Sequence, residues 1–220
     1  MKISLQNILG ALAVLTGMGS CSHQADTLPF FNTADFSPEW ISEGSPHYQK
    51  IHTIPAFAFF NQDGAIVTEK TIQGKIAVAD FFFTSCPGIC PRLTKNMGTV
   101  QSAFTNDPMV TLLSYSVTPD IDSVPRLKEY ATSHSILSGR WHLLTGDRKE
   151  IYTLARQGYF ADEEVGLQKS ENEFLHTENF ILIDTHRRIR GVYNGTNPAE
   201  IERLIEDIRI LKQETPDENS

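Results

Sequence analysis

The stretch KIAVADFFF, Lys75 to Phe83, runs directly into TSCPGICP, Thr84 to Pro91, and this junction is the strongest indication of the fold. The first part is almost continuously apolar, as expected for a central strand that is buried on both faces of a sheet. The second part brings two cysteines, Cys86 and Cys90, to the end of that strand. Open α/β sheets place their reactive groups beyond the carboxyl ends of their strands. The junction therefore predicts a buried strand with a reactive loop at its end.

Elements of both kinds surround this strand. Before it, the runs PAFAFF and AIVT are separated by the turn Asn61–Gly64 and predict a β-hairpin. After it, helical and strand patterns alternate, with helices expected over 91–104, 123–134, 147–157 and 197–211 and strands over 109–117, 140–145, 179–184 and 189–194. This order predicts a thioredoxin-like α/β fold, in which a mixed central sheet has helices on both faces and an N-terminal β-hairpin.

Length and composition are those of one globular domain with short appendages. The chain has 220 residues, of which 40% are hydrophobic and 21% charged. A core of this size can bury most of its apolar surface without disulfide bonds. The net charge of -8 argues against a nucleic-acid partner, because phosphate binding requires a basic face.

The N-terminus carries export signals. Lys2 provides a basic start, and the apolar run Ile8–Gly19 has the length of a signal-peptide core but is short for a membrane span. The run leads into Ser20-Cys21, which resembles a bacterial lipobox; the alternative is a plain secretory signal with a chance cysteine. We therefore expect a membrane-anchored lipoprotein of the cell envelope that faces the periplasm. The expected divisions are a lipoprotein-type signal peptide over 1–20, a tether lipidated at Cys21 over 21–48, a thioredoxin-like copper-binding domain over 49–213 and a flexible tail over 214–220.

Lipidation of Cys21 leaves two cysteines, Cys86 and Cys90, with three residues between them. A thioredoxin-type redox pair has two intervening residues. Pro91 disfavours a helical conformation at Cys90, so Cys90 is expected at a helix boundary. There the positive end of the helix dipole favours thiolate over thiol. Two converging thiolates suit Cu(I), Zn(II) or an iron–sulfur cluster, while a disulfide and a redox couple remain alternatives.

A third metal ligand has to come from another segment, and histidine is the leading type. Among seven histidines, His176 lies just before the expected strand 179–184, and in a thioredoxin topology this loop abuts the cysteine turn. The segment Glu173–Asn179 contains no proline, whereas thioredoxin-type oxidoreductases carry a cis-proline at this place. We therefore predict that His176 is the third ligand.

Four segments together resemble the SCO/SenC family of copper chaperones: Phe82–Pro91, Ser116–Asp120 with Pro125, Trp141–Gly146 and Phe174–Asn179. The resemblance covers roughly residues 54–211. It implies that Cys86, Cys90 and His176 bind one copper per chain, as Cu(I) or Cu(II). It also implies a role in assembling the binuclear copper centre of cytochrome c oxidase. The implied partners are a copper-accepting oxidase subunit and a copper donor chaperone, with attachment to a membrane.

Two features depart from the family pattern. The family's aspartate-rich run here reads Thr118–Pro125, and its spacing is disturbed around Asp122, so Asp122 is given no role. The usual anchor is a transmembrane helix, and here a lipid on Cys21 would replace it.

Three hypotheses follow for the cysteine pair. The first is a metallochaperone, which binds copper without catalytic turnover. The second is a thiol–disulfide oxidoreductase for exported proteins, in which Cys86 attacks and Cys90 resolves the mixed disulfide. The third is a static disulfide, which is disfavoured because so short a loop adds little stability. Met97 is expected to pack in the core rather than to bind metal.

Overall fold

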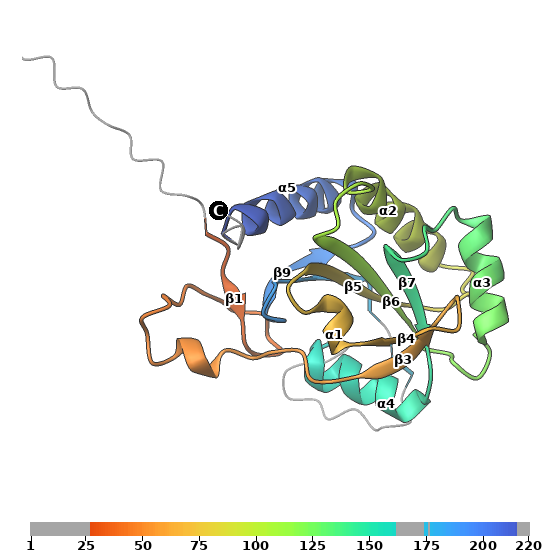
Figure 1. Ribbon diagram of the computed structural model, residues 1–220, viewed down its shortest axis with the longest axis horizontal. Helices are drawn as coiled ribbons and strands as arrows, with labels where there is room; N and C mark the ends of the chain where they lie inside the picture. The colour runs from red at the N-terminus through yellow and green to blue at the C-terminus, as the bar shows by residue number, and fades with distance from the viewer. Residues whose placement is uncertain (1–26, 162–173, 176, 215–220) are drawn as a thin grey trace, which may run out of the picture.

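The structure is a computed structural model, and it describes residues 27–161, 174–175 and 177–214 (Figure 1). The strands are β1 (Phe30–Phe31), β2 (Pro38–Glu39), β3 (Ala58–Asn61), β4 (Ile66–Thr68), β5 (Ile76–Phe82), β6 (Val110–Ser116), β7 (Trp141–Thr145), β8 (Asn179–Ile183) and β9 (Ile189–Asn194). The helices are the 3-10 turn η1 (Tyr48–Lys50), α1 (Glu69–Ile72), α2 (Cys90–Ala103), α3 (Val124–Ser133), α4 (Arg148–Thr153), the π-helical turn η2 (Leu154–Gly158) and α5 (Pro198–Glu214).

Seven strands form one mixed sheet in the order β4-β3-β7-β6-β5-β8-β9. β5, β6 and β7 are parallel to one another, and the remaining pairs are antiparallel. All seven residues of β5 are buried, as the apolar run at 75–83 predicted. The predicted hairpin is confirmed as β3 and β4, which pair through Phe60 and Ile66. The predicted α/β class and mixed sheet are therefore confirmed.

Helices cover both faces of this sheet, as predicted (Figure 1). Alternate side chains of a strand point to opposite faces, so neighbouring residues of β5 contribute to different core clusters. Val78 packs in a cluster with Leu93 of α2 and Leu204 of α5. Ala79 packs in the other cluster with Ile151 of α4. This layering fixes α2, and with it the cysteines, against the centre of the sheet.

Three helices after residue 50 depart from the sequence-based elements. The helix expected over 147–157 is regular only as far as Thr153 and continues as the π-helical turn η2. The last helix runs on to Glu214, three residues beyond its expected end. The single-turn helix α1 was not predicted; it begins where Thr68 accepts a hydrogen bond from the Lys70 backbone N–H.

Residues 27–50, here called the strap, pack on the body of the domain. The guanidinium of Arg190 donates hydrogen bonds to the carbonyl oxygens of Leu28 (2.5 Å) and Pro29 (3.0 Å). The ring of Phe30 lies 4.2 Å from the Arg190 guanidinium carbon and 5.0 Å from that of Arg188. Residues 28–30, which belong to the segment expected as a tether, are thus held against the domain.

The predicted signal peptide over 1–20, Cys21 and most of the predicted tail lie outside the described residues. Within the described part of the chain, no helix combines the length and apolar character needed to cross a membrane.

Candidate metal centre

The carboxyl end of β5 leads into residues 83–89, here called the cysteine loop, and α2 begins at Cys90. Cys90 is thus at the helix boundary that Pro91 predicted. The backbone N–H of Cys86 donates to the carbonyl of Phe83 at 3.3 Å, and the Ile89 carbonyl accepts from the first turn of α2. Both cysteines therefore lie at the N-terminus of α2, where unpaired N–H groups and the helix dipole favour negative charge.

The two cysteines are free thiols in different environments. Cys90 is 4% exposed, and burial, with the hydrogen bond to Cys86, raises the pKa of its thiol to about 12. Cys86 is half-buried. Burial also raises the pKa of Cys86, but hydrogen bonds from Cys90 and from the backbone N–H groups of Gly88 and Ile89 outweigh it, so the pKa lies below 9.0. Cys86 is thus the thiol that ionises first.

This donor set fits a soft metal ion. Metal binding requires deprotonated sulfur, and the positive charge of a bound cation stabilises the second thiolate. The hydrogen bond between the thiols places Cys86 and Cys90 next to each other in the reduced protein. Two adjacent thiolates match the preference of Cu(I) for sulfur. Within residues 27–161, 174–175 and 177–214, no cluster of three metal-binding side chains occurs.

The cysteine loop is anchored by the fully buried carboxylate of Asp122. This carboxylate accepts hydrogen bonds from the backbone N–H (3.2 Å) and hydroxyl (2.5 Å) of Thr84. It also accepts from the hydroxyls of Ser116 (2.6 Å) and Thr118 (3.1 Å). Asp122 therefore joins the segment after β6 to the loop that carries Cys86. No role was predicted for Asp122 because its spacing differs from the family pattern, whereas the structure shows that it positions this loop.

Replacing Asp122 with Ala should destabilise the protein and loosen the cysteine loop. We expect a loss of about 3 kcal/mol in the free energy of unfolding, because buried donors from Thr84, Ser116 and Thr118 would lose their acceptor. Urea unfolding of the reduced protein measures this loss. The matched control is Asp120→Ala. Asp120 is 76% exposed and its ion pair with Arg148 is long, at 3.9 Å, so its loss should cost less than about 0.5 kcal/mol. Equal effects of the two substitutions would contradict the anchoring role.

His176, the predicted third ligand, lies outside the described residues. Its described neighbours lie near the cysteine loop. The ring of Phe174 packs edge-on against Phe83 of the loop, with 5.5 Å between ring centres. Leu175 is buried in the core. Asn179 begins β8, which runs antiparallel to β5, so the segment before it approaches the carboxyl end of β5.

The five histidines that the structure describes are engaged elsewhere. His134 stacks on Tyr130, and His142 is buried beside Asn61. The remaining contacts are those of His52 with Gly158 and of His186 with Thr185 and Arg188, and His47 lies on the exposed surface of the strap. None of these contacts involves the cysteine loop. Met97 is fully buried in the core, as expected.

A model of the SCO1/SenC family matches residues 45–213. The chain belongs to the SCO1/SenC family. The resemblance inferred from the four sequence segments is thereby confirmed, and the thioredoxin-like fold agrees with solved members of the family.

Three solved Sco structures are similar to this chain. A SCO1/SenC family lipoprotein from Bacillus anthracis is 31% identical, with 73% of this chain and 95% of that chain covered and a TM-score of 0.64. BsSco, described as a member of the Sco family of cytochrome c oxidase assembly proteins with a disulfide switch, is 26% identical over 75% and 96% of the chains, with a TM-score of 0.63. Arabidopsis thaliana ScoI, solved with copper bound, is 25% identical over 70% and 97%, with a TM-score of 0.55.

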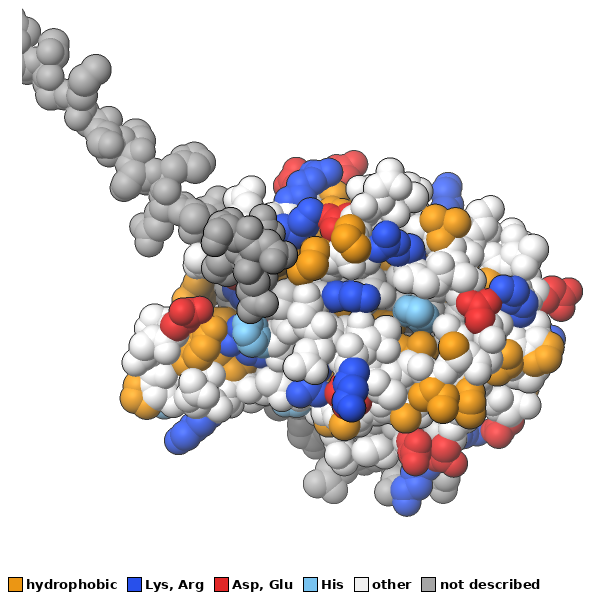
Figure 2. All heavy atoms as spheres, viewed as in Figure 1, with side chains coloured by type: hydrophobic (Ala, Val, Ile, Leu, Met, Phe, Trp, Pro, Cys, Tyr) orange, Lys and Arg blue, Asp and Glu red, His pale blue; other side chains and the backbone are white. Residues whose placement is uncertain are grey.

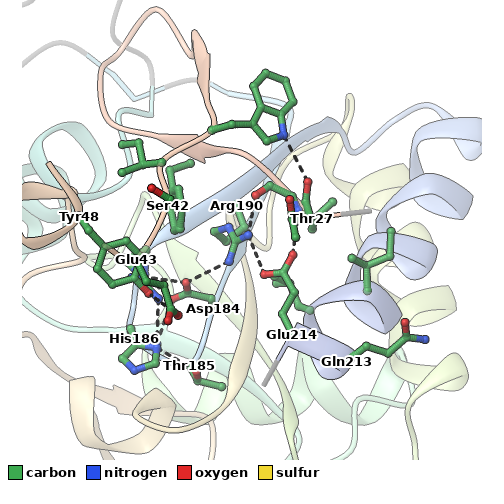
Figure 3. A pocket seen from close by; sticks show the side chains of 17 residues that line it. Thr27, Ser42, Glu43, Tyr48, Asp184, Thr185, His186, Arg190, Gln213 and Glu214 are labelled. Atoms are coloured by element: carbon green, nitrogen blue, oxygen red, sulfur yellow. Dashed lines mark hydrogen bonds and ion pairs between the residues drawn. The ribbon is translucent and has the colours of Figure 1, made fainter. Parts of the chain in front are cut away.

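This Sco-family chain also has a cavity of about 710 Å³ between the strap, the β8–β9 turn and the end of α5 (Figure 3). The charged groups on its wall pair with one another: Asp184 contacts both Arg188 and Arg190, and Glu214 contacts Arg190. Ile183 pairs with Ala77, so the turn after β8 lies at the amino end of β5. The cavity therefore lies at the opposite end of the strands from the cysteines and forms no part of their site.

Proposed function

We propose that this protein is a copper-binding metallochaperone for the assembly of a respiratory cytochrome c oxidase. The observation that carries the proposal is the pair of free, hydrogen-bonded thiols at the N-terminus of α2. Family membership and the relatives described with copper and with oxidase assembly support it. The oxidase subunit that accepts copper and the chaperone that donates it are its proposed partners.

The proposed ligands divide the work. Cys86 is half-buried and less enclosed than Cys90, so a partner's ligand would approach the metal from its side. Cys90 is held in the core and keeps its sulfur in a fixed position. His176 is the proposed third ligand, from a separate segment of the chain. A single nitrogen ligand is the natural one to detach first, because Cu(I) prefers the two sulfurs. Ligand exchange with the acceptor would then complete the transfer.

The second candidate function is thiol–disulfide exchange on an oxidase subunit. The difference in pKa between the thiols favours it, because the half-buried Cys86, with the lower pKa, suits the attacking role and the buried Cys90 the resolving role. The target disulfide would gain two electrons and two protons while Cys86 and Cys90 form a disulfide. A further thiol reductant would have to restore the pair.

Metal analysis with absorbance spectroscopy tests the choice between these functions. The purified protein, reconstituted with copper, should hold one copper per chain and show thiolate-to-Cu(II) charge-transfer bands. A protein that retains no copper but has a readily reduced disulfide would favour the oxidoreductase. The same reconstitution with Zn(II) in competition tests the preference of the two sulfurs for Cu(I).

Replacing His176 with Ala should weaken Cu(II) binding about tenfold more than Cu(I) binding, because Cu(II) prefers nitrogen ligands and Cu(I) is held by sulfur. Titrations of both oxidation states measure the two affinities. The matched control is His186→Ala, since His186 lies at the opposite end of the strands from the cysteines. An equal loss for both states would contradict this greater effect on Cu(II), and an unchanged Cu(II) affinity would exclude His176 as a Cu(II) ligand. A His176→Ala protein that still reduces a target disulfide at the normal rate would favour the second candidate function.

The proposed localisation is the periplasmic face of the cell envelope, with a lipid on Cys21. The sequence before Cys21 supports it, and the B. anthracis relative is described as a lipoprotein. Labelling of growing cells with a radioactive fatty acid should mark the wild-type chain and leave a Cys21→Ser chain unmarked. Equal labelling of both chains would exclude this anchor.

A further inference from the structure

The strap is fixed to the domain by buried charged groups. The Arg190 side chain is 5% exposed and bonds two strap carbonyls, and Glu214 accepts a hydrogen bond from the Leu28 backbone N–H at 2.8 Å. Phe30 is 6% exposed beside the guanidinium groups of Arg188 and Arg190. These contacts hold the strap in one orientation relative to the sheet (Figure 3).

Trp40 is the most exposed large hydrophobic side chain of the described residues, at 67%. Its indole N–H donates to the carbonyl of Thr27 at 3.3 Å, so the ring lies beside the point at which the chain leaves the described domain. Half-buried Ile41 follows it directly in sequence, and exposed Pro38 lies two residues before it. In Figure 2, hydrophobic side chains are exposed on the part of the surface that the strap forms, as they are on other parts of this face. An isolated exposed apolar residue is ordinary, but its position at the chain exit is informative.

The length of chain between Cys21 and Thr27 limits what this surface can reach. Six residues span at most about 20 Å when fully extended. A lipid on Cys21 would therefore hold Thr27, and the indole bonded to it, within that distance of the bilayer surface. Trp side chains prefer the interface between acyl chains and headgroups, because the ring is apolar and the N–H is polar.

We infer that the strap surface around Trp40 docks on the lipid bilayer and sets the orientation of the anchored domain. The inference rests on the proposed lipid at Cys21. The strap lies at the amino end of β5 and Cys86 beyond its carboxyl end, so docking turns the cysteines away from the membrane. The seven residues of β5 separate its two ends by on the order of 20 Å. Glu39 and Glu43 flank Trp40, so the contact uses the indole rather than attraction to anionic headgroups.

The test uses the mature chain from Cys21, attached to vesicles independently of cellular lipidation. Oxidising Cys86 and Cys90 to a disulfide leaves Cys21 as the only free thiol of the three cysteines, and a maleimide-bearing lipid can then be coupled to it. The vesicles consist of phosphatidylcholine with or without bromine atoms on the acyl chains near the headgroup. The two tryptophans differ in exposure, with Trp40 at 67% and Trp141 at 1%, so collisional quenching reports on Trp40.

Brominated vesicles should quench about half of the Trp40 emission, because the indole would sit at headgroup depth. The Trp40→Phe protein provides the baseline, and circular dichroism confirms that it folds. Quenching no greater than in Trp40→Phe would overturn the inference. So would an emission change that follows the protein-to-lipid ratio and not the bromine, because a second copy of the chain would then cover Trp40. The coupled lipid replaces the natural one, so a failure here is separable from a failure of the proposed anchor.

Discussion

Iodoacetamide is expected to alkylate Cys86 on the order of 100-fold faster than Cys90 in the reduced, copper-free protein at pH 7.5. Even at the ordinary pKa of 9.0, about 3% of a thiol is ionised at this pH, whereas a pKa of about 12 leaves a thiolate fraction roughly a thousandfold smaller. The higher basicity of the Cys90 thiolate offsets this by about 30-fold. Burial of Cys90 at 4% exposure then slows access of the reagent.

Peptide mapping by mass spectrometry measures the two alkylation rates in the same sample. The Cys86→Ser protein is the control, because Cys90 should stay slow there through its burial alone. Equal labelling of the two cysteines in the wild type would show that the pair is not divided into a more accessible and a buried thiol. It would also remove the structural reason for assigning Cys86 as the attacking sulfur in the second candidate function.

The fold was predictable because its strongest signals are local. The run at 75–83 is apolar throughout most of its length, and a strand with both faces covered needs little else to be recognised. The turn at Asn61–Gly64 fixed the first hairpin, and Gly64 adopts the positive φ of 74° that such a turn requires. The strap was not predicted as structured, because its order depends on Arg190 and Glu214, which lie more than 160 residues later in the sequence.

The candidate site was predictable only in part, because some of its contacts join residues that are far apart in the sequence. Cys86 and Cys90 are close in sequence, and Pro91 marks the start of the helix that follows the cysteine loop. The contact of Asp122 with Thr84 joins residues 38 apart, and no spacing rule reveals such a contact. Asp80 was missed differently: it lies inside the apolar run of β5, where its neighbours make the strand look like pure core.

Asp80 explains part of the difference between the two thiols. It is 2% exposed and bonded to the hydroxyl of Ser114, which in turn accepts from the indole of Trp141 at 2.8 Å. Its negative charge contributes to the raised pKa of Cys90. The ionised carboxylate of Asp80 therefore lowers the stability of the folded protein and helps to raise the pKa of Cys90.

Replacing Asp80 with Asn should stabilise the protein at pH 8 by about 4 kcal/mol, since burial raises the Asp80 pKa from 3.8 to about 7 and each pKa unit corresponds to roughly 1.4 kcal/mol. Below pH 4 the carboxyl is protonated in the folded and unfolded states alike, and it makes no difference to stability. Between pH 4 and 7 only the unfolded state loses the proton, so wild-type stability falls as the pH rises. Above pH 7 the penalty stays constant. Asn keeps a hydrogen-bonding group for Ser114 and has no charge to bury.

Urea unfolding of both proteins, reduced and copper-free, at pH 5 and pH 8 measures the effect. The advantage of Asp80→Asn should grow from about 1.5 kcal/mol at pH 5 to about 4 kcal/mol at pH 8. Asp63→Asn is the control of opposite sign, because a hydrogen bond from Lys128 lowers the Asp63 pKa, so its removal should slightly destabilise the protein at pH 8. An Asp80→Asn protein with the same advantage at both pH values would show that Asp80 is not a buried acid with a raised pKa. A pH-dependent gain would show that β5 retains a costly carboxyl beneath the cysteine site.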